Sequence, residues 1–188
     1  STPASGIRAD TNPAFAGLGA FAIVDAANAN RFPPVGGTDG LLTQAEVTRI
    51  LGEALRIANR ARAQIRLPLG NSAQVSIAVV DTSAAVLGLV RTADAPVFGI
   101  DVSVQKARTA LLFSQPTAAA ALNLLAPATY LSPPATSPIG VYVDAMRIFI
   151  PGGTSLSDGI AHSSRAVGNL ARPFFPDGLN GNGPGPLS

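Results

Sequence analysis

The sequence predicts a mixed α/β (α+β) fold, in which helices flank a β-hairpin. An amphipathic pattern after residue 43 predicts a helix, and the apolar run QVSIAVVD at residues 74–81 predicts a buried strand. A second apolar run, AVLGLVRT at residues 85–92, follows after only three residues and predicts the partner strand of a hairpin. At 188 residues, the chain is long enough for one domain with its own core.

The first helix has signals at both of its ends. Thr43-Gln44-Ala45-Glu46 matches a capping box, in which the Thr hydroxyl and the Glu carboxylate satisfy backbone N–H groups reciprocally. Pro68 and Gly70 are expected to stop the helix. Between these signals, apolar residues recur at helical spacing and predict the buried face: Val47, Ile50, Leu51, Ala54, Ile57, Ala58, Ala61 and Ile65.

Proline and glycine divide the rest of the chain. Residues 1–40 are predicted to be an N-terminal extension with one short apolar strand. Residues 97–113 predict a second helix, and residues 116–125 predict a short alanine-rich helix that opens on a proline. Four prolines predict a loop over residues 126–138, and the run MRIFI at residues 146–150 predicts a strand.

Composition argues against several classes of function. The net charge of +2 is too small, and the aromatic residues too few, to predict nucleic-acid binding. The absence of cysteine excludes disulfides and thiolate metal sites, and no apolar run approaches the roughly 20 residues that span a bilayer. Only 13% of the residues are charged, about half the usual quarter, which favours contact with other chains. We therefore expect a homo-oligomer or a companion chain as partner.

The succession of elements is similar to one family. The strand VSIAVVD, a tight turn, a second strand ending in VRTADA and a helix carrying DVSVQKARTALLF are followed by PGG and then DG. Together these segments, over roughly residues 41–159, resemble the GlcG/HbpS-type haem-binding family, whose domain also occurs at the C-terminus of PduO-type proteins. The resemblance implies an antiparallel sheet packed against helices, usually in an oligomer, with haem or corrinoid-related binding in some members. Residues 160–188 would then form a C-terminal extended segment.

The chain departs from this family pattern in three places. Ala84 stands in the hairpin where the family usually has glycine, which would cost about 1 kcal/mol if its backbone is left-handed. The first helix has no histidine, although histidines ligate haem in some relatives. After Asp158-Gly159 the family's glycine-rich final strand is missing, so we expect that the chain continues beyond Ser188 or that another chain fills the gap.

Four residues are predicted to bind the cofactor that the resemblance implies: Arg91, Asp94, Lys106 and His162. Arg91 and Lys106 suit the propionates of haem or another carboxylated ligand. For Lys106, an ion pair with Asp101 or Asp94 is the alternative that the residues alone favour. His162 is the only histidine, and two interpretations are open: a ligand or a hydrogen-bonded residue of a serine-rich loop.

Other conceivable axial ligands are Tyr130, Tyr142 and Met146, although each also suits packing. One histidine and no cysteine argue against a tetrahedral zinc site. A hydrolase triad would depend on His162 alone, and the serines lack the strand–turn–helix context of a nucleophile elbow. No pattern therefore predicts catalysis, and we favour a protein that is not an enzyme.

Two functions remain open from the sequence. The first is a binding module for haem or a related tetrapyrrole, and the second is a structural or interaction subunit without a cofactor. Ser1 is not followed by the basic and apolar regions of a signal peptide, so we expect that a signal peptide has been removed or that the chain is a fragment. Both alternatives predict a processed product, which we expect to be secreted or periplasmic. Near the other end, Phe174 and Phe175 lie between prolines, and we expect them to dock on their own domain or on a neighbouring chain.

Overall fold

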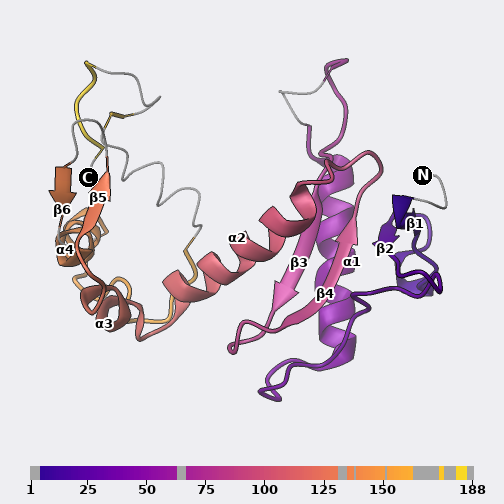
Figure 1. Ribbon diagram of the computed structural model, residues 1–188, viewed down its shortest axis with the longest axis horizontal. Helices are drawn as coiled ribbons and strands as arrows, with labels where there is room; N and C mark the ends of the chain where they lie inside the picture. The colour runs from indigo at the N-terminus through magenta and orange to yellow at the C-terminus, as the bar shows by residue number, and fades with distance from the viewer. Residues whose placement is uncertain are drawn as a thin grey trace. The chain divides into compact units, whose positions relative to one another are not determined.

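The computed structural model describes residues 5–62, 67–130, 135–137, 139–150, 152–162, 174–175 and 181–185. The chain divides into two compact units, Ser1–Arg108 and Thr109–Ser188, which we call unit 1 and unit 2 and describe separately. The division falls inside a helix, α2 (Figure 1). Antiparallel strands and helices make up the described chain, which confirms the predicted α/β (α+β) class.

Unit 1 is built on a four-stranded antiparallel sheet with the order β1-β2-β4-β3. The N-terminal segment supplies β1 (Ile7–Ala9) and β2 (Phe21–Ile23), and β2 lies in the apolar run where a strand was predicted. The predicted hairpin supplies β3 (Ser76–Val80) and β4 (Val86–Arg91). A short 3-10 helix follows β1 at residues 13–15. Because β4 and β2 lie inside the sheet, β1 and β3 are its edge strands.

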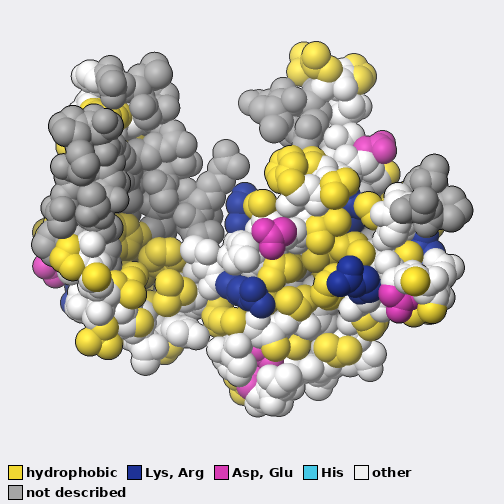
Figure 2. Space-filling model, viewed as in Figure 1, with side chains coloured by type: hydrophobic (Ala, Val, Ile, Leu, Met, Phe, Trp, Pro, Cys, Tyr) yellow, Lys and Arg dark blue, Asp and Glu magenta, His cyan; other side chains and the backbone are white. Residues whose placement is uncertain are grey.

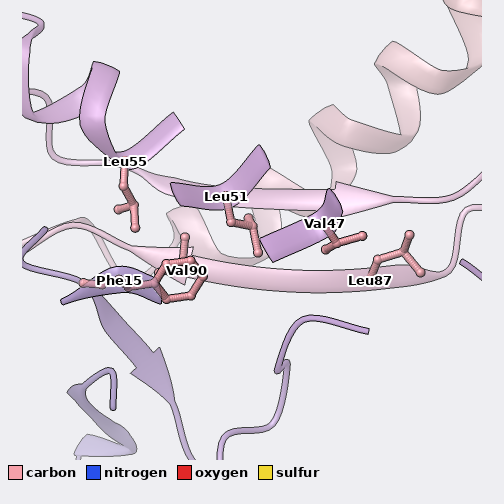
Figure 3. Packing of buried hydrophobic residues seen from close by; sticks show 7 residues of the cluster. Phe15, Val47, Leu51, Leu55, Leu87 and Val90 are labelled. Carbon is pink, nitrogen blue, oxygen red and sulfur yellow. The ribbon is translucent and has the colours of Figure 1, made fainter. Parts of the chain in front are cut away.

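The helix α1 (Gln44–Arg60) covers one face of this sheet (Figure 3). Its capping box is confirmed, because the Glu46 N–H donates to Thr43 Oγ1 at 3.2 Å and the Thr43 N–H donates to Glu46 Oε2 at 2.8 Å. Gly88 of β4 permits a close approach, since a Cβ there would lie 2.8 Å from Leu51 Cδ1. The core between helix and sheet consists of Phe15, Ala20, Val47, Leu51, Leu55, Leu87 and Val90.

The buried face predicted for α1 is only partly right. Val47 and Leu51 are fully buried, but Ile50 and Ile57 are 42% and 60% exposed. The helix packs on β4 and on the edge strand β3, and its buried residues Val47, Leu51, Leu55 and Ala58 face the sheet. The helix also ends ahead of the predicted stop, because Ala61 adopts extended backbone angles.

The β3–β4 hairpin is confirmed, with its turn at Thr82-Ser83-Ala84. Ala84 has a φ of 64°, so it occupies the left-handed conformation for which glycine is favoured. The prediction that the first strand of this hairpin is buried is only partly right, because every residue of β3 is partly exposed, although Ile77 and Val79 pack against the core. An edge strand has a neighbour on one side only, which leaves its outer side open.

Unit 2 contains the end of α2, two further helices and a small hairpin. The second and third predicted helices are confirmed as α2 (Gly99–Ser114) and α3 (Ala118–Asn123), although no residue of α2 is fully buried. They are followed by β5 (Ala128–Tyr130), β6 (Ala135–Ser137) and α4 (Ile139–Phe149). The core of unit 2 consists of Ala118, Ala119, Leu122, Val143, Met146 and Leu156.

Two predictions for this part of the chain are wrong. The run MRIFI is helical as far as Phe149, where α4 ends, because Val143, Met146 and Ile150 recur at helical spacing and pack on the core of unit 2. The predicted loop over residues 126–138 contains the antiparallel pair β5 and β6. Neither strand includes a proline, so the prolines of this segment lie outside the paired residues.

The C-terminal segment is described only in part. Phe174 and Phe175 are half-buried, and the Phe175 N–H donates to the Gly183 carbonyl at 2.8 Å. Their docking on another surface stays a prediction. The stretch after the Asp158-Gly159 turn, where the family strand was expected, lies from residue 163 onward outside the described residues. No helix in the described part of the chain is long and apolar enough to cross a membrane.

Candidate functional site

A cleft opens in unit 1 where β4 ends, and it contains two of the four predicted site residues. Its volume is about 240 Å³. Gly88 and Val90 face α1, so the alternation of side chains along β4 places Arg91 on the opposite face of the sheet. The walls combine apolar side chains with a few polar ones: Ile7, Phe21, Ala95 and Val97, with Ser5, Arg91, Thr92 and Asp94.

Arg91 is the most buried charged side chain of the cleft, with only 3% of the residue exposed. Its Nη2 donates to the carbonyl of Ala95, and its Nε donates to Ser76 Oγ at 3.4 Å. Burial lowers the pKa of Arg91 from its usual value, because desolvation disfavours the charged form. The guanidinium nevertheless stays protonated at neutral pH.

No carboxylate neutralises this guanidinium within the described chain. The one ion pair found there joins Arg56 to Glu53 on α1, at 2.6 Å. Asp94 lines the same cleft but forms no ion pair with Arg91. A buried charge is costly unless it is paired. The cleft therefore presents an uncompensated cation at its wall.

The turn after β4 holds the mouth of the cleft in place. Asp94 has a φ of 56° and so occupies the left-handed region, which aspartate tolerates better than most residues. Thr92 fastens the turn to the start of β3, because its Oγ1 accepts the Val75 N–H at 2.9 Å. A second cleft, of about 310 Å³ and with more polar walls, adjoins the same turn and includes Asn59, Asn71, Ser72 and Gln74.

The other two predicted site residues lie elsewhere. Lys106 is exposed on α2 and does not line either cleft. Within the residues described, it forms no ion pair with Asp94 or Asp101, the alternative that the sequence left open. His162 belongs to unit 2, where its backbone N–H donates to Ser114 Oγ at 3.3 Å and its Nε2 is buried without a hydrogen-bond partner in the described chain. The structure thus brings Arg91 and Asp94 together, and the roles of Lys106 and His162 stay predictions.

The conceivable axial ligands also lie in unit 2. Met146 is 1% exposed and belongs to the apolar core. The Tyr142 ring packs against Phe113 with 6.1 Å between centroids, and burial raises the pKa of the Tyr142 hydroxyl to about 12. The side chain of Tyr130 lies outside the described residues. Both described side chains serve packing in unit 2.

Sequence reasoning missed the contribution of the N-terminal segment to the cleft. Ile7 and Phe21 supply apolar wall, although they lie 84 and 70 positions before Arg91 in the chain. They reach it because Phe21 of β2 pairs directly with Arg91 of β4. No local pattern could reveal this pairing, since it depends on the order of strands in the sheet. The apolar run at residues 14–26 was the only available signal.

The chemistry available at this cleft is recognition of an anion. A guanidinium donates several hydrogen bonds in one plane and matches the two oxygens of a carboxylate. Apolar walls beside it suit a ligand that is mostly apolar and carries an acidic group. In the part of the chain that the structure describes, no cluster of three or more His, Cys, Asp or Glu side chains could hold a metal ion.

Comparisons with known proteins give one match. No curated protein and no solved structure matches the chain significantly. A family model described as "Haem degrading protein HbpS-like" matches residues 51–169, which is more than half of the chain. The matched stretch contains α1 from Leu51 onward, the β3–β4 hairpin, Arg91 and Asp94. The chain therefore belongs to the HbpS-like family.

Proposed function

We propose that this protein binds haem or a related tetrapyrrole through a carboxylate, and that the Arg91 cleft is where this carboxylate sits. The observation that carries the proposal is the buried guanidinium of Arg91 without an acidic partner in the described chain. A propionate supplies the missing negative charge and two acceptor oxygens. Membership of the HbpS-like family relates the chain to haem and so directs the choice among carboxylated ligands.

The cleft fits one edge of a tetrapyrrole rather than the whole molecule. Pockets that enclose a drug-sized ligand hold roughly 300–1,000 Å³, and this cleft holds about 240 Å³. Its lining contains no His, Cys, Met, Tyr or Lys side chain that could ligate iron. We therefore assign binding of the propionate edge to these residues and assign no reaction step to them. Haem held in this way keeps its iron available to other groups.

The binding test compares haem with variants of the ligand and of the protein. Haemin titrated into the full chain is expected to shift its Soret band, and metal-free protoporphyrin IX is expected to bind with similar affinity because the contact is to the propionates. The dimethyl ester of haem should bind far more weakly. Removal of the guanidinium in Arg91→Ala should weaken binding roughly 10- to 100-fold, since a hydrogen bond to a charged group contributes about 1.5–3 kcal/mol.

Two further variants make this test specific. Arg49→Ala removes an exposed arginine of α1 and should bind haem like the unaltered protein. Lys106→Ala tests the sequence prediction separately, and a loss equal to that of Arg91→Ala would show that the lysine shares the carboxylate. Circular dichroism must show that Arg91→Ala is folded. Equal binding of haem and its dimethyl ester, or unchanged binding by folded Arg91→Ala, would contradict the proposal.

A second candidate function is supported by a different observation. Several large apolar side chains of unit 1 are more than half exposed, among them Leu41, Ile57, Val97 and Phe98. Exposed apolar surface favours association with other chains, as a structural or interaction subunit without a cofactor would need. A colourless protein that binds no added haem but forms a defined oligomer would support this function. The expected location outside the cytoplasm stays a prediction, which fractionation of the native cells would check.

A further inference from the structure

The second cleft of unit 1, of about 310 Å³, is lined differently from the Arg91 cleft beside it. Three of its lining residues carry side-chain amides, Asn59, Asn71 and Gln74, and we call it the amide cleft. Asp94 borders both clefts and is the only charged residue in the lining of this one. The amide cleft therefore has a polar wall that carries one negative charge.

The two asparagines of the amide cleft are oriented by backbone carbonyls. Asn59 Nδ2 donates to the Leu18 carbonyl at 2.8 Å, and Asn71 Nδ2 donates to the Leu67 carbonyl at 3.1 Å. Only the nitrogen end of an amide can donate, so these bonds fix which end of each side chain is the oxygen. The protein thus uses both amide nitrogens itself and leaves the two Oδ1 atoms as acceptors for a ligand.

The carboxylate of Asp94 has no cationic partner within the described residues. It forms no ion pair there, although Arg91 is only three positions away and lines the neighbouring cleft. The Arg91 guanidinium donates to the Ala95 carbonyl and to Ser76 Oγ instead. Asp94 therefore adds a charged acceptor to the amide oxygens.

The surroundings of the amide cleft favour a positive charge. Asn59 lies in the last turn of α1, and the C-terminal end of a helix carries a partial negative charge. Arg62 follows closely in the chain, but its Nη1 donates to the carbonyls of Asn59 and Arg60 at 3.4 and 3.1 Å, and it does not line the cleft. Figure 2 shows only isolated charged side chains on the face of unit 1 that is in view. The lining therefore keeps its net negative charge.

We propose that the amide cleft binds the primary ammonium group of a small amine. An ammonium has three N–H donors and no acceptor, so it matches a lining whose available groups are acceptors. The Asp94 carboxylate balances its charge, and the amide oxygens of Asn59 and Asn71 accept its other N–H groups. The volume of about 310 Å³ lies at the lower end of pockets that enclose small molecules. This site does not depend on haem, because the ammonium and the carboxylate occupy different clefts.

Three other classes of ligand fit this lining less well. A divalent cation such as Ca²⁺ takes about six to eight oxygen ligands, among them several carboxylates, and the lining of the amide cleft has one carboxylate. A quaternary ammonium is recognised by aromatic side chains, and this lining has none. Each hydroxyl of a sugar is an acceptor as well as a donor, so a sugar would meet too few donors here.

Butylamine is the simplest probe, and nuclear magnetic resonance of the full chain detects its binding in the absence of haem. In a nitrogen–proton correlation spectrum, butylamine is expected to shift the backbone signal of Asp94 and the side-chain amide signals of Asn59 and Asn71. Butanol has the same carbon chain without the charge, and tetramethylammonium has the charge without an N–H group. Neither should shift these signals. The affinity for butylamine should fall as salt is added, because salt screens the exposed carboxylate.

Two substitutions that change one charge each are expected to have opposite effects. Asp94→Asn removes the carboxylate and should weaken the binding of butylamine roughly tenfold or more. Asparagine also tolerates the left-handed backbone of this position, so the turn is kept. Gln74→Glu adds a second carboxylate to the lining and should tighten binding. Asp101→Asn, which removes an exposed carboxylate of α2 outside the lining, is the matched control and should bind like the unaltered protein.

The outcomes separate this proposal from the one for haem. Arg91→Ala, which tests the haem site, should not weaken the binding of butylamine. Equal shifts with butanol would show a site for neutral polar ligands, and unchanged affinity in Asp94→Asn would show that the carboxylate does not hold the amine. A lysine with blocked backbone groups that binds as tightly as butylamine would assign the cleft to a protein side chain. Any of these three results would overturn the proposal.

Discussion

The backbone of Ala84 has a φ of 64°, in the hairpin turn between β3 and β4. A left-handed conformation costs an L-residue about 1–2 kcal/mol, whereas glycine adopts it freely but loses more entropy on folding. We expect Ala84→Gly to raise the free energy of unfolding by about 0.5–1 kcal/mol in urea denaturation. Ala85→Gly, next to it without a positive φ, should lower the free energy of unfolding. A loss of stability in both variants would contradict the assigned strain.

Asp81 fastens the loop before α1 to the same hairpin. Its Oδ2 accepts the N–H and hydroxyl of Thr38 at 3.0 and 2.5 Å, and its Oδ1 accepts two backbone N–H groups of its own turn. In return, Asp39 Oδ2 accepts the N–H and hydroxyl of Thr82 at 2.9 and 2.7 Å. These hydrogen bonds, above all that from the Thr38 hydroxyl, lower the pKa of Asp81 from its usual 3.8, and the Thr82 hydroxyl does the same for Asp39.

The lowered pKa values predict how stability depends on pH. A carboxyl whose pKa is lower in the folded state contributes stability that is present above its unfolded pKa. This contribution is therefore complete at pH 7 and is lost as the pH falls below about 4 towards the folded pKa. Asp81→Asn should be less stable than the unaltered protein at pH 7. It should also lose less stability between about pH 5 and about pH 2, with stability measured as the urea midpoint. Asp101→Asn, exposed on α2, should follow the curve of the unaltered protein.

Among the elements, α4 shows where local sequence signals mislead. The run MRIFI is rich in residues that favour strands, and a strand would put Met146 and Ile148 on one face. In the helix they are on opposite faces, so Met146 is 1% exposed and Ile148 is 84% exposed. The signal for the helix was the helical spacing of Val143, Met146 and Ile150. This spacing is visible only when the run is read together with the residues before it.

This difference gives a prediction about the element. Met146→Ala should destabilise unit 2 by about 2–5 kcal/mol, as truncation of a buried side chain does. Ile148→Ala should change stability by less than about 0.5 kcal/mol, because its side chain is exposed. Amide hydrogen exchange in α3 and α4 measures the stability of unit 2 in each variant relative to the unaltered protein. Equal losses in the two variants would favour the strand.

Elements with strong local signals were predicted well, and those defined by distant partners were not. The capping box and the hairpin turn depend on a few adjacent residues, so α1 and the β3–β4 pair could be predicted from the sequence. The exposed side of β3 and of α1 could not, because burial depends on which strand lies beside β3 in the sheet. An apolar pattern shows which face prefers burial, but it does not say whether the same chain supplies the cover.

At the scale of the whole molecule, the candidate site is partly readable from the sequence. Arg91 and Asp94 lie close together in the chain, and the family resemblance pointed to both. Ile7 and Phe21 complete the cleft through the β2–β4 pairing, which no local pattern encodes. Lys106 and His162 lie outside the cleft lining, and His162 is in the other unit. The sequence could therefore identify the charged residues of the cleft but not its walls.

The division of the chain leads to a prediction about the independence of unit 1. All seven residues of its core cluster lie between Phe15 and Val90, and the cleft also lies within Ser1–Arg108. A chain of residues 1–114, which keeps α2 whole, should therefore fold cooperatively without unit 2. It should keep the circular dichroism signature of a mixed α/β fold and the affinity of the full chain for haem.

The matched control for this truncation is the same chain with Leu51→Ala, which removes a fully buried side chain from the core beneath α1. A loss of about 2–5 kcal/mol in that variant would show that the shortened chain has the packed core of unit 1 rather than a loose helical state. If residues 1–114 are unfolded, the stability of unit 1 depends on contacts that unit 2 supplies.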